Sequence, residues 1–151
     1  MGIYFYGAKD AAYGCFSNFS DHGIELDGKY WPTVEHYFQA QKFVTTDPDW
    51  AEKIRQALTP AEAKKRGGNR SHPLREDWET VKDDLMRQAV KRKFETHAEI
   101  REILLATGDE EIVENAPRDY YWGCGATGGG KNMLGLILME TREAMKPTGE
   151  K

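Results

Sequence analysis

A chain of 151 residues has the length of one domain and can bury about two-thirds of its unfolded surface in a single core. Charged residues make up 30% and hydrophobic residues 39%, which excludes a disordered chain, and no apolar run approaches the roughly 20 residues of a membrane span. The formal net charge of −4 argues against a broad basic surface for nucleic acid. We expect a soluble, cytoplasmic protein with one domain over residues 1–151.

Cysteine and histidine are too sparse for a disulfide framework or a zinc site. The two cysteines, Cys15 and Cys124, lie far apart, and the four histidines are scattered along the chain. We expect both thiols to be reduced, and neither a metal nor another cofactor.

The first thirty residues favour short strands. Ile3 to Tyr6 is β-branched and aromatic and predicts a strand. Residues 23–31 alternate apolar with polar side chains around an Asp-Gly turn, which predicts a hairpin. Between them Asn18 lies in a loop of aromatic and small polar residues, where its amide either turns the backbone or holds a sugar hydroxyl.

The stretch from Trp31 to Phe43 is predicted to be a helix, with Pro32 in its first turn. Glu35, Gln39 and Lys42 then share one face at i, i+4 and i+7. Charges at helical spacing usually form a solvated surface. A carboxyl group, an amide and an amine flanked by aromatic rings suit the wall of a pocket better, so we place the candidate chemistry here.

Apolar spacing predicts further helices over residues 50–58, 60–67 and, as a pair, 76–107, and a short strand over 112–115. Thr59 is the expected N-cap of the helix over 60–67. The loop of residues 69–75 is rich in cationic side chains. Arg70 or Arg75 can receive a phosphate there, although a single surface arginine is more often simply solvated.

Residues 119–132 form a glycine-rich segment that runs into an apolar helix, Met133 to Met145. This layout can offer bare backbone N–H groups and a helix N-terminus to an anion. It matches neither the Walker-A pattern nor a dinucleotide fingerprint, so a flexible connector is an equal alternative. Gly135 inside the helix predicts the close approach of another element.

Several of these segments together resemble the NADAR family, in particular its YbiA-like N-glycosidases. The segments that carry the resemblance are Ser17-Asn18-Phe19, Trp31-Pro32-Thr33 with residues 35–43, Asn69-Arg70 with Pro73-Leu74-Arg75, and Asp119 to Asn132 with Gly135. The resemblance covers nearly the whole chain.

The resemblance implies a compact, mainly helical α+β domain with a few short N-terminal strands. It also implies hydrolysis of the C–N glycosidic bond in ribosylamino-pyrimidine phosphates of riboflavin biosynthesis, which gives ribose 5-phosphate and a free pyrimidine. Related members remove ADP-ribose from guanine bases. The implied partner is a small ribosyl phosphate, with ADP-ribosylated nucleic acid as the alternative, and neither a membrane nor an obligatory protein partner.

Carried onto this sequence, the resemblance implies a pocket built from Asn18, Trp31, Glu35, Lys42, Asp119 and Trp122. We predict Glu35, Lys42 and Asp119 as catalytic. Substrate binding is assigned to Asn18, Trp31, Arg70, Trp122, Gly125 and Asn132.

Breaking a ribosyl C–N bond requires an anionic group beside the developing oxocarbenium ion and a proton donor for the leaving base. Glu35 and Asp119 supply two carboxyl groups, and either can serve as the acid. Lys42 offers another route, in which its amine attacks C1′ and forms a Schiff base, provided that it is partly neutral. Trp31 or Trp122 would stack on the base.

Two other classes of function fit parts of the sequence. A non-catalytic module that binds ADP-ribose or a nucleotide would use the same pocket and release no sugar. RNA or DNA binding through residues 64–75 would depend steeply on salt and not on Glu35, and the acidic net charge makes it the weakest of the three.

Overall fold

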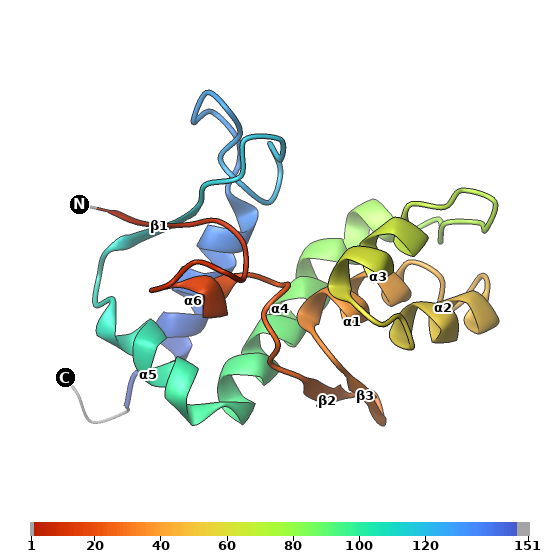
Figure 1. The fold of residues 1–151 in the computed structure, drawn as a ribbon, viewed down its shortest axis with the longest axis horizontal. Coiled ribbons are helices and arrows are strands. Elements are labelled where there is room, and N and C mark those ends of the chain that lie inside the picture. Colours follow the sequence, from red (N-terminus) through yellow and green to blue (C-terminus); the bar gives the residue numbers. More distant parts are fainter. Residues whose placement is uncertain (1, 148–151) are drawn as a thin grey trace. The chain divides into compact units, whose positions relative to one another are not determined.

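The structure is a computed structural model and describes residues 2–147. The chain forms two compact units, one from its beginning to Ser20 and from Phe94 onward, the other from Asp21 to Lys93. Residues 2–147 contain six α-helices, one short 3₁₀ helix and four strands (Figure 1). The predicted mainly helical α+β class is confirmed.

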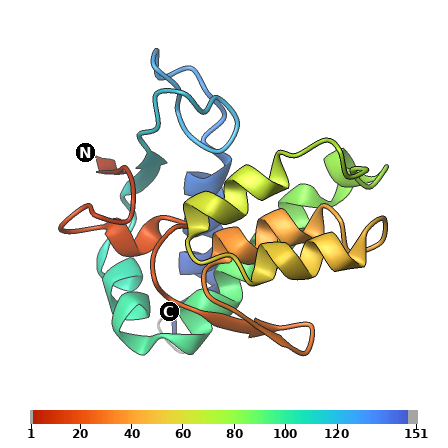
Figure 2. The same cartoon turned by 45° about the vertical axis from the view of Figure 1, so that its right-hand side comes forward.

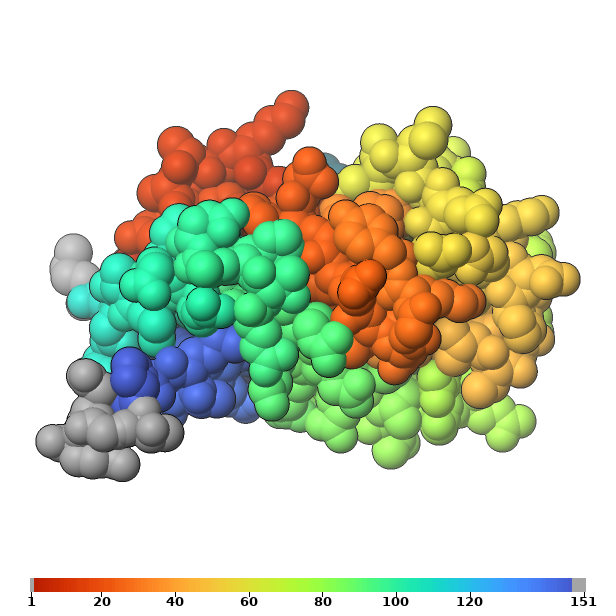
Figure 3. Space-filling model, turned by 90° about the horizontal axis from the view of Figure 1, so that it is seen from below, coloured from red at the N-terminus to blue at the C-terminus, as the bar shows by residue number. Residues whose placement is uncertain are grey.

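The unit from Asp21 to Lys93 begins with the predicted hairpin. Strands β2 (Ile24–Leu26) and β3 (Lys29–Trp31) are antiparallel, with Glu25 opposite Tyr30. Asp27 and Gly28 have φ angles of 57° and 78°, the left-handed pair that a two-residue turn between right-twisted strands needs. Arg92, in the part of helix α4 (Trp78–Thr96) that belongs to this unit, donates to the carbonyl oxygen of Glu25. Figure 3 shows hairpin and helix side by side at the surface.

Helix α1 (Val34–Gln41) follows and is shorter than predicted. Its N-cap is Thr33, whose hydroxyl accepts the N–H of His36 over 3.2 Å. The placement of Pro32 in the first helical turn was wrong, because Trp31 is paired in β3 and the cap at Thr33 starts the helix only afterwards.

Helices α2 (Pro48–Arg55) and α3 (Pro60–Gly67) pack against α1 (Figure 2). All eight residues of α1 are buried. Asp47 caps α2, and Thr59 caps α3 as predicted by accepting the N–H of Glu62 over 3.1 Å. Both helices also carry Pro at the first position, where its missing N–H costs nothing. Helix α4 (Trp78–Thr96) continues from this unit into the other.

The other unit joins β1 (Gly2–Phe5) to β4 (Glu111–Glu114) in a parallel pair, with Ile3 beside Ile112. Helix α6 (Met133–Met145), with its predicted bounds, packs on β4, and α5 (Ala98–Ala106) contacts α6. The core includes the ring of Phe16, from the 3₁₀ helix Gly14–Phe16. Its centroid lies 5.8 Å from that of Phe5 and 6.1 Å from that of Phe94.

Gly135 explains how closely α6 approaches β4. A Cβ at this position would lie 2.1 Å from the carbonyl oxygen of Ile112, so only glycine fits, as predicted. Cys15 and Cys124 are both free thiols. No helix within residues 2–147 has the length and apolar character needed to cross a membrane.

Candidate active site

One face of α1 carries a buried carboxyl–amide pair. The Nε2 of Gln39 donates to Oε2 of Glu35 over 2.7 Å, one helical turn apart, and the two residues are only 6% and 7% exposed. The predicted stripe is therefore present on the helix, and its polar groups face the interior of the unit rather than solvent.

Lys42 is the C-cap of α1 and completes the stripe. Burial, followed by the positive charges of Arg70, Lys64 and Lys82, lowers its pKa to about 8, while the charge of Glu35 acts in the opposite direction. The Nζ atom also lies 5.7 Å from the ring centroid of Trp78. A substantial fraction of this amine is neutral near pH 8, and only the neutral amine can act as a nucleophile.

Arg70 and Arg75, both considered for phosphate binding, have different surroundings. Arg70 is exposed, and its Nη1 donates to the carbonyl oxygen of Gly67 over 2.9 Å. Arg75 is engaged in structure: it forms an ion pair with Asp77, and its Nη1 and backbone N–H donate to the carbonyl oxygens of Gln41 and Lys42. Arg75 thus stabilises the C-terminus of α1, and Arg70 is the better placed cation for an anionic ligand.

His36 has a structural role on the same helix. Its Nδ1 lies 2.8 Å from the hydroxyl of Thr33, and its Nε2 lies 2.9 Å from the carbonyl oxygen of Ala57. Because a carbonyl only accepts, Nε2 carries the proton and Nδ1 accepts from Thr33. Burial lowers the pKa of His36, so the ring is neutral and joins α1 to the end of α2.

Trp31 is part of the core. Its ring is 3% exposed and packs edge-on against Tyr37, and its Nε1 donates to the carbonyl oxygen of Leu26 over 2.9 Å. A ring that is 3% exposed leaves little surface for a base to stack on, so the half-buried Trp122 is the better of the two predicted candidates.

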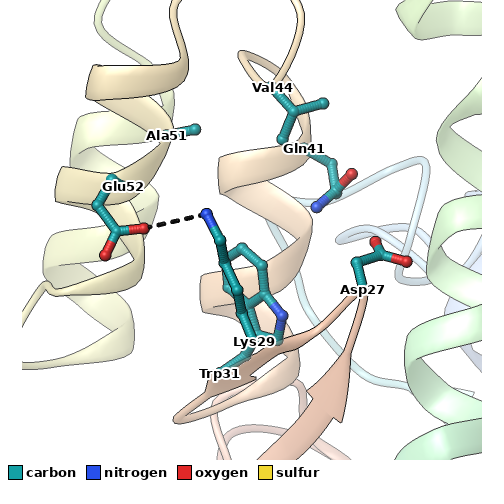
Figure 4. A pocket seen from close by; sticks show the side chains of 7 residues that line it. All are labelled: Asp27, Lys29, Trp31, Gln41, Val44, Ala51 and Glu52. Carbon is teal, nitrogen blue, oxygen red and sulfur yellow. Dashed lines mark hydrogen bonds and ion pairs between the residues drawn. The ribbon is translucent and has the colours of Figure 1, made fainter.

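A cavity of about 200 Å³ lies beside Trp31, on a different face of α1 from Glu35. It is lined by Asp27, Lys29, Trp31, Gln41, Val44, Ala51 and Glu52 (Figure 4). Lys29 and Glu52 form an ion pair of 3.4 Å across it. This cavity separates the hairpin from α2 and includes none of the predicted catalytic residues.

In the other unit, Asp119 organises the turn that presents Trp122. One oxygen, Oδ1, accepts the N–H groups of Tyr121 and Trp122 over 3.0 Å and 2.8 Å. The rings of Tyr121 and Trp122 then meet edge to face at 4.9 Å between centroids. Asp119 and Trp122 are both half-buried.

The glycine-rich loop does not offer the bare N–H groups that were predicted for an anion. Backbone N–H groups donate to acceptors within this unit at Gly125, Ala126, Gly128, Gly129, Gly130, Lys131, Asn132, Met133 and Leu134. At the start of α6, the N–H groups of Met133 and Leu134 donate to the carbonyl oxygens of Tyr121 and Trp122. For these groups the cradle was a wrong prediction, because the chain folds back and satisfies them itself.

Asn132 and Asn18, both predicted to bind substrate, lie in this same unit. Asn132 is buried with a left-handed backbone, and its amide bridges β4: Oδ1 accepts the N–H of Glu114 over 3.0 Å, and Nδ2 donates to Ile112 over 2.9 Å. This accounts for Asn132 as a structural residue. Asn18 is half-buried in the loop after the 3₁₀ helix.

Each unit thus gathers part of the predicted set. Glu35, Lys42 and Arg70 come together in one, and Asp119, Trp122, Gly125 and Asn132 share one loop in the other. Sequence reasoning missed Trp78 and Lys82, which reach Lys42 from α4. Their only signal was that they lie four residues apart on one predicted helix. Within residues 2–147 no cluster of three metal-ligating side chains occurs.

Comparison with known proteins gives a consistent assignment. The NADAR domain matches residues 4–146. An N-glycosidase of Nostoc punctiforme is 54% identical over 147 residues, 97% of this chain and 94% of that protein. The N-glycosidase YbiA of Escherichia coli is 52% identical over 143 residues, 95% of this chain and 88% of YbiA. The NMR structure of E. coli YbiA has a TM-score of 0.85 at 47% identity and covers 100% of this chain and 94% of its own.

A plant relative extends the comparison. The riboflavin biosynthesis protein PYRR of Zea mays is 42% identical over 159 residues, which cover 97% of this chain and 25% of the maize protein. The matched domain, the similar N-glycosidases and the shared fold show that the chain belongs to the NADAR family. It is an N-glycosidase of the type that YbiA represents, which sets aside the purely binding module considered from the sequence.

Proposed function

We propose that the enzyme hydrolyses the C–N glycosidic bond of ribosylamino-pyrimidine phosphates of riboflavin biosynthesis. The observation that carries this proposal is Lys42, an amine with a pKa of about 8 beside Glu35 and among three other cations. A phosphorylated ribosylamine offers an anion to Arg70 and an electrophilic C1′ to the amine. The name of the maize relative supports the choice of pathway.

In the proposed reaction the neutral amine of Lys42 attacks C1′, and the bond between C1′ and the base nitrogen breaks. The leaving nitrogen keeps the electron pair and takes a proton from the attacking nitrogen. The sugar ring then opens to a protonated Schiff base on Lys42 as its ring oxygen takes a proton from solvent. Water adds to C1′ and expels the amine, which regenerates Lys42 and yields ribose 5-phosphate.

Other predicted residues take supporting roles in this proposal. Glu35 faces the positive charge that develops at C1′. In the other unit, Asp119 fixes the turn that carries Trp122, and the stacking of a base on Trp122 stays a prediction from the sequence. The contact of Asn18 with a sugar hydroxyl likewise stays a prediction.

Trapping with borohydride tests the role of Lys42. Reduction during turnover of the ribosylamino-pyrimidine phosphate should add the mass of the opened sugar phosphate to the peptide that contains Lys42. Lys42→Met should release no ribose 5-phosphate, and Lys42→Arg, which keeps the charge, should be equally inactive. Turnover without any adduct, or an active Lys42→Met enzyme, would remove Lys42 as the nucleophile.

The substrate is tested separately by comparing kcat/KM for the ribosylamino-pyrimidine phosphate and for ADP-ribosylated guanine. We expect the first to be the better substrate. A clear preference for the second would reverse the assignment and leave the bond type unchanged.

A further inference from the structure

The side chain of Gln39 makes one hydrogen bond among the described residues, and its partner is Glu35. Its Nε2 donates to Oε2 of Glu35 over 2.7 Å. Its other polar atom, Oε1, is buried, and no donor among the described residues reaches it. Gln39 is only 6% exposed, and the single hydrogen bond of its side chain goes to the Glu35 carboxyl group, so the amide holds that group in place.

The hydrogen bond from Gln39 favours the ionised form of Glu35. The N–H occupies Oε2, so that oxygen cannot carry a proton unless the amide reverses. An N–H donates more strongly to a carboxylate than to a neutral carboxyl group, so the bond stabilises the charged form and the pair favours the carboxylate.

Gly67, the last residue of α3, forms the wall behind this amide. A Cβ at position 67 would lie 1.9 Å from Oε1 of Gln39 and 2.7 Å from its Cδ. Any larger residue would displace the carboxamide, so the glycine keeps Gln39 directed at Glu35.

The surrounding charges favour the same form. Lys42 lies on the same helix, Lys64 comes from α3, Arg70 from the loop that follows, and Lys82 from α4. The last three cations all act on Lys42, and Lys42 and Glu35 are close enough to influence each other, whereas His36 on the same helix is neutral. A carboxylate in this setting is suited to stabilise positive charge at C1′ and cannot donate a proton to the leaving base.

We propose that Gln39 is a positioning residue that holds Glu35 as a carboxylate, that Gly67 leaves room for it to do so, and that Glu35 is therefore the anionic stabiliser and not the general acid. The inference rests on the proposed function for the role of Glu35 in the reaction. The geometry of Gln39, Glu35 and Gly67 stands without it.

Gln39→Met, which keeps the volume and removes the amide, is the first test, and Gln41→Met is its matched control on another face of the same helix. Without the donor, Glu35 takes up a proton at higher pH. The acidic limb of the kcat/KM profile should then move upward by about one pH unit in Gln39→Met and stay in place in Gln41→Met. KM at the pH optimum should change little. An unmoved acidic limb in Gln39→Met would overturn the proposal.

Gly67→Ala tests the same contact from α3, with Gly68→Ala as control, because a Cβ at position 68 meets only an ordinary contact of 3.6 Å. Gly67→Ala should shift the limb in the same direction, and Gly68→Ala should not. In the double variant with Gln39→Met the two shifts should not add. Additive shifts would show that Gly67 acts by another path.

Direct titration separates this inference from the substrate assignment. The Glu35 carboxyl signal, followed by NMR in protein labelled with ¹³C-glutamate and assigned through Glu35→Gln, should titrate at higher pH in Gln39→Met than in the unaltered protein. This measurement needs no substrate. Equal titration in the two proteins would refute the role of Gln39 even if the proposed reaction were correct.

Discussion

The buried amine of Lys42 lowers the stability of the fold. Its pKa of about 8 lies below the ordinary 10.5, so the folded state holds the proton less tightly than the unfolded chain. The loss of stability caused by burying the charged amine is complete below pH 8. It disappears as the pH rises from 8 to 10.5. A functional group that lowers stability at neutral pH is the usual sign of a site shaped for chemistry.

Lys42→Met should therefore raise the free energy of unfolding at pH 7 by about 1–3 kcal/mol while it abolishes the proposed Schiff base. Urea unfolding measures the change, with the exposed Lys65→Met on α3 as a control that should change stability little. A Lys42→Met protein less stable than the unaltered one at pH 7 would contradict this account.

At this scale the sequence predicts what lies on one helix. The spacing of Glu35, Gln39 and Lys42 was enough to place them on one face, and the hydrogen bond between the first two confirms that geometry. The charges that lower the pKa of Lys42 come from α3, α4 and a loop. No local pattern predicts contacts made by tertiary packing.

The elements were predicted best where a local signal acts alone. The Asp27-Gly28 turn, the cap at Thr59 and the bounds of α6 were all correct. The start of α1 was wrong because Pro32 fits a first helical turn, yet pairing of Trp31 across the hairpin decides the outcome. Of the two alternatives for the glycine-rich loop, the anion cradle was wrong, because glycine composition does not reveal where N–H groups point.

Gly135→Ala tests the packing of α6 on β4. Helix propensity alone favours alanine by about 1 kcal/mol, but the added Cβ would lie 2.1 Å from the Ile112 carbonyl and 2.3 Å from the Asn132 amide. We expect a net loss of about 2–4 kcal/mol in chemical unfolding. Leu136→Ala, at the exposed neighbouring position, should cost less, and a neutral Gly135→Ala would disprove the close approach.

For the whole molecule, composition excluded more than it specified. The net charge of −4 excludes a broadly basic chain, yet it conceals a local group of four cations, Lys42 and the three that act on it. Averages over a chain do not reveal such clusters, because residues distant in sequence supply them. RNA or DNA binding by residues 64–75 has a competitor in the phosphate contact that we propose for Arg70.

The pH dependence of global stability should depend on His36. Burial lowers the pKa of His36 below the ordinary 6.5. Below pH 6.5 the unfolded chain therefore binds a proton at His36 more tightly than the folded protein does. The contribution of neutral His36 to the free energy of unfolding is complete above pH 6.5. It is lost as the pH falls below that value, at up to about 1.4 kcal/mol per pH unit.

His36→Gln keeps a donor for the Ala57 carbonyl and removes the titration, so its unfolding free energy should vary less between pH 7 and pH 5. Thermal or urea unfolding across that range provides the measurement, and His22→Gln should retain the original slope. An unchanged slope in His36→Gln would assign the acid sensitivity to other groups.

The folding back of the glycine-rich loop on itself restricts how this part of the chain can vary among relatives. A Cβ at Gly130 would lie 2.6 Å from the carbonyl oxygen of Gly123, so the base of the loop is backbone packed on backbone. Changes in length are tolerated only at its exposed tip, residues 126–129, because an inserted residue elsewhere would put every following N–H out of step with its acceptor. The glycines in this segment fit a fixed pairing of backbone N–H groups with their acceptors. Relatives should therefore differ in the tip of the loop and agree in the number of residues that flank it.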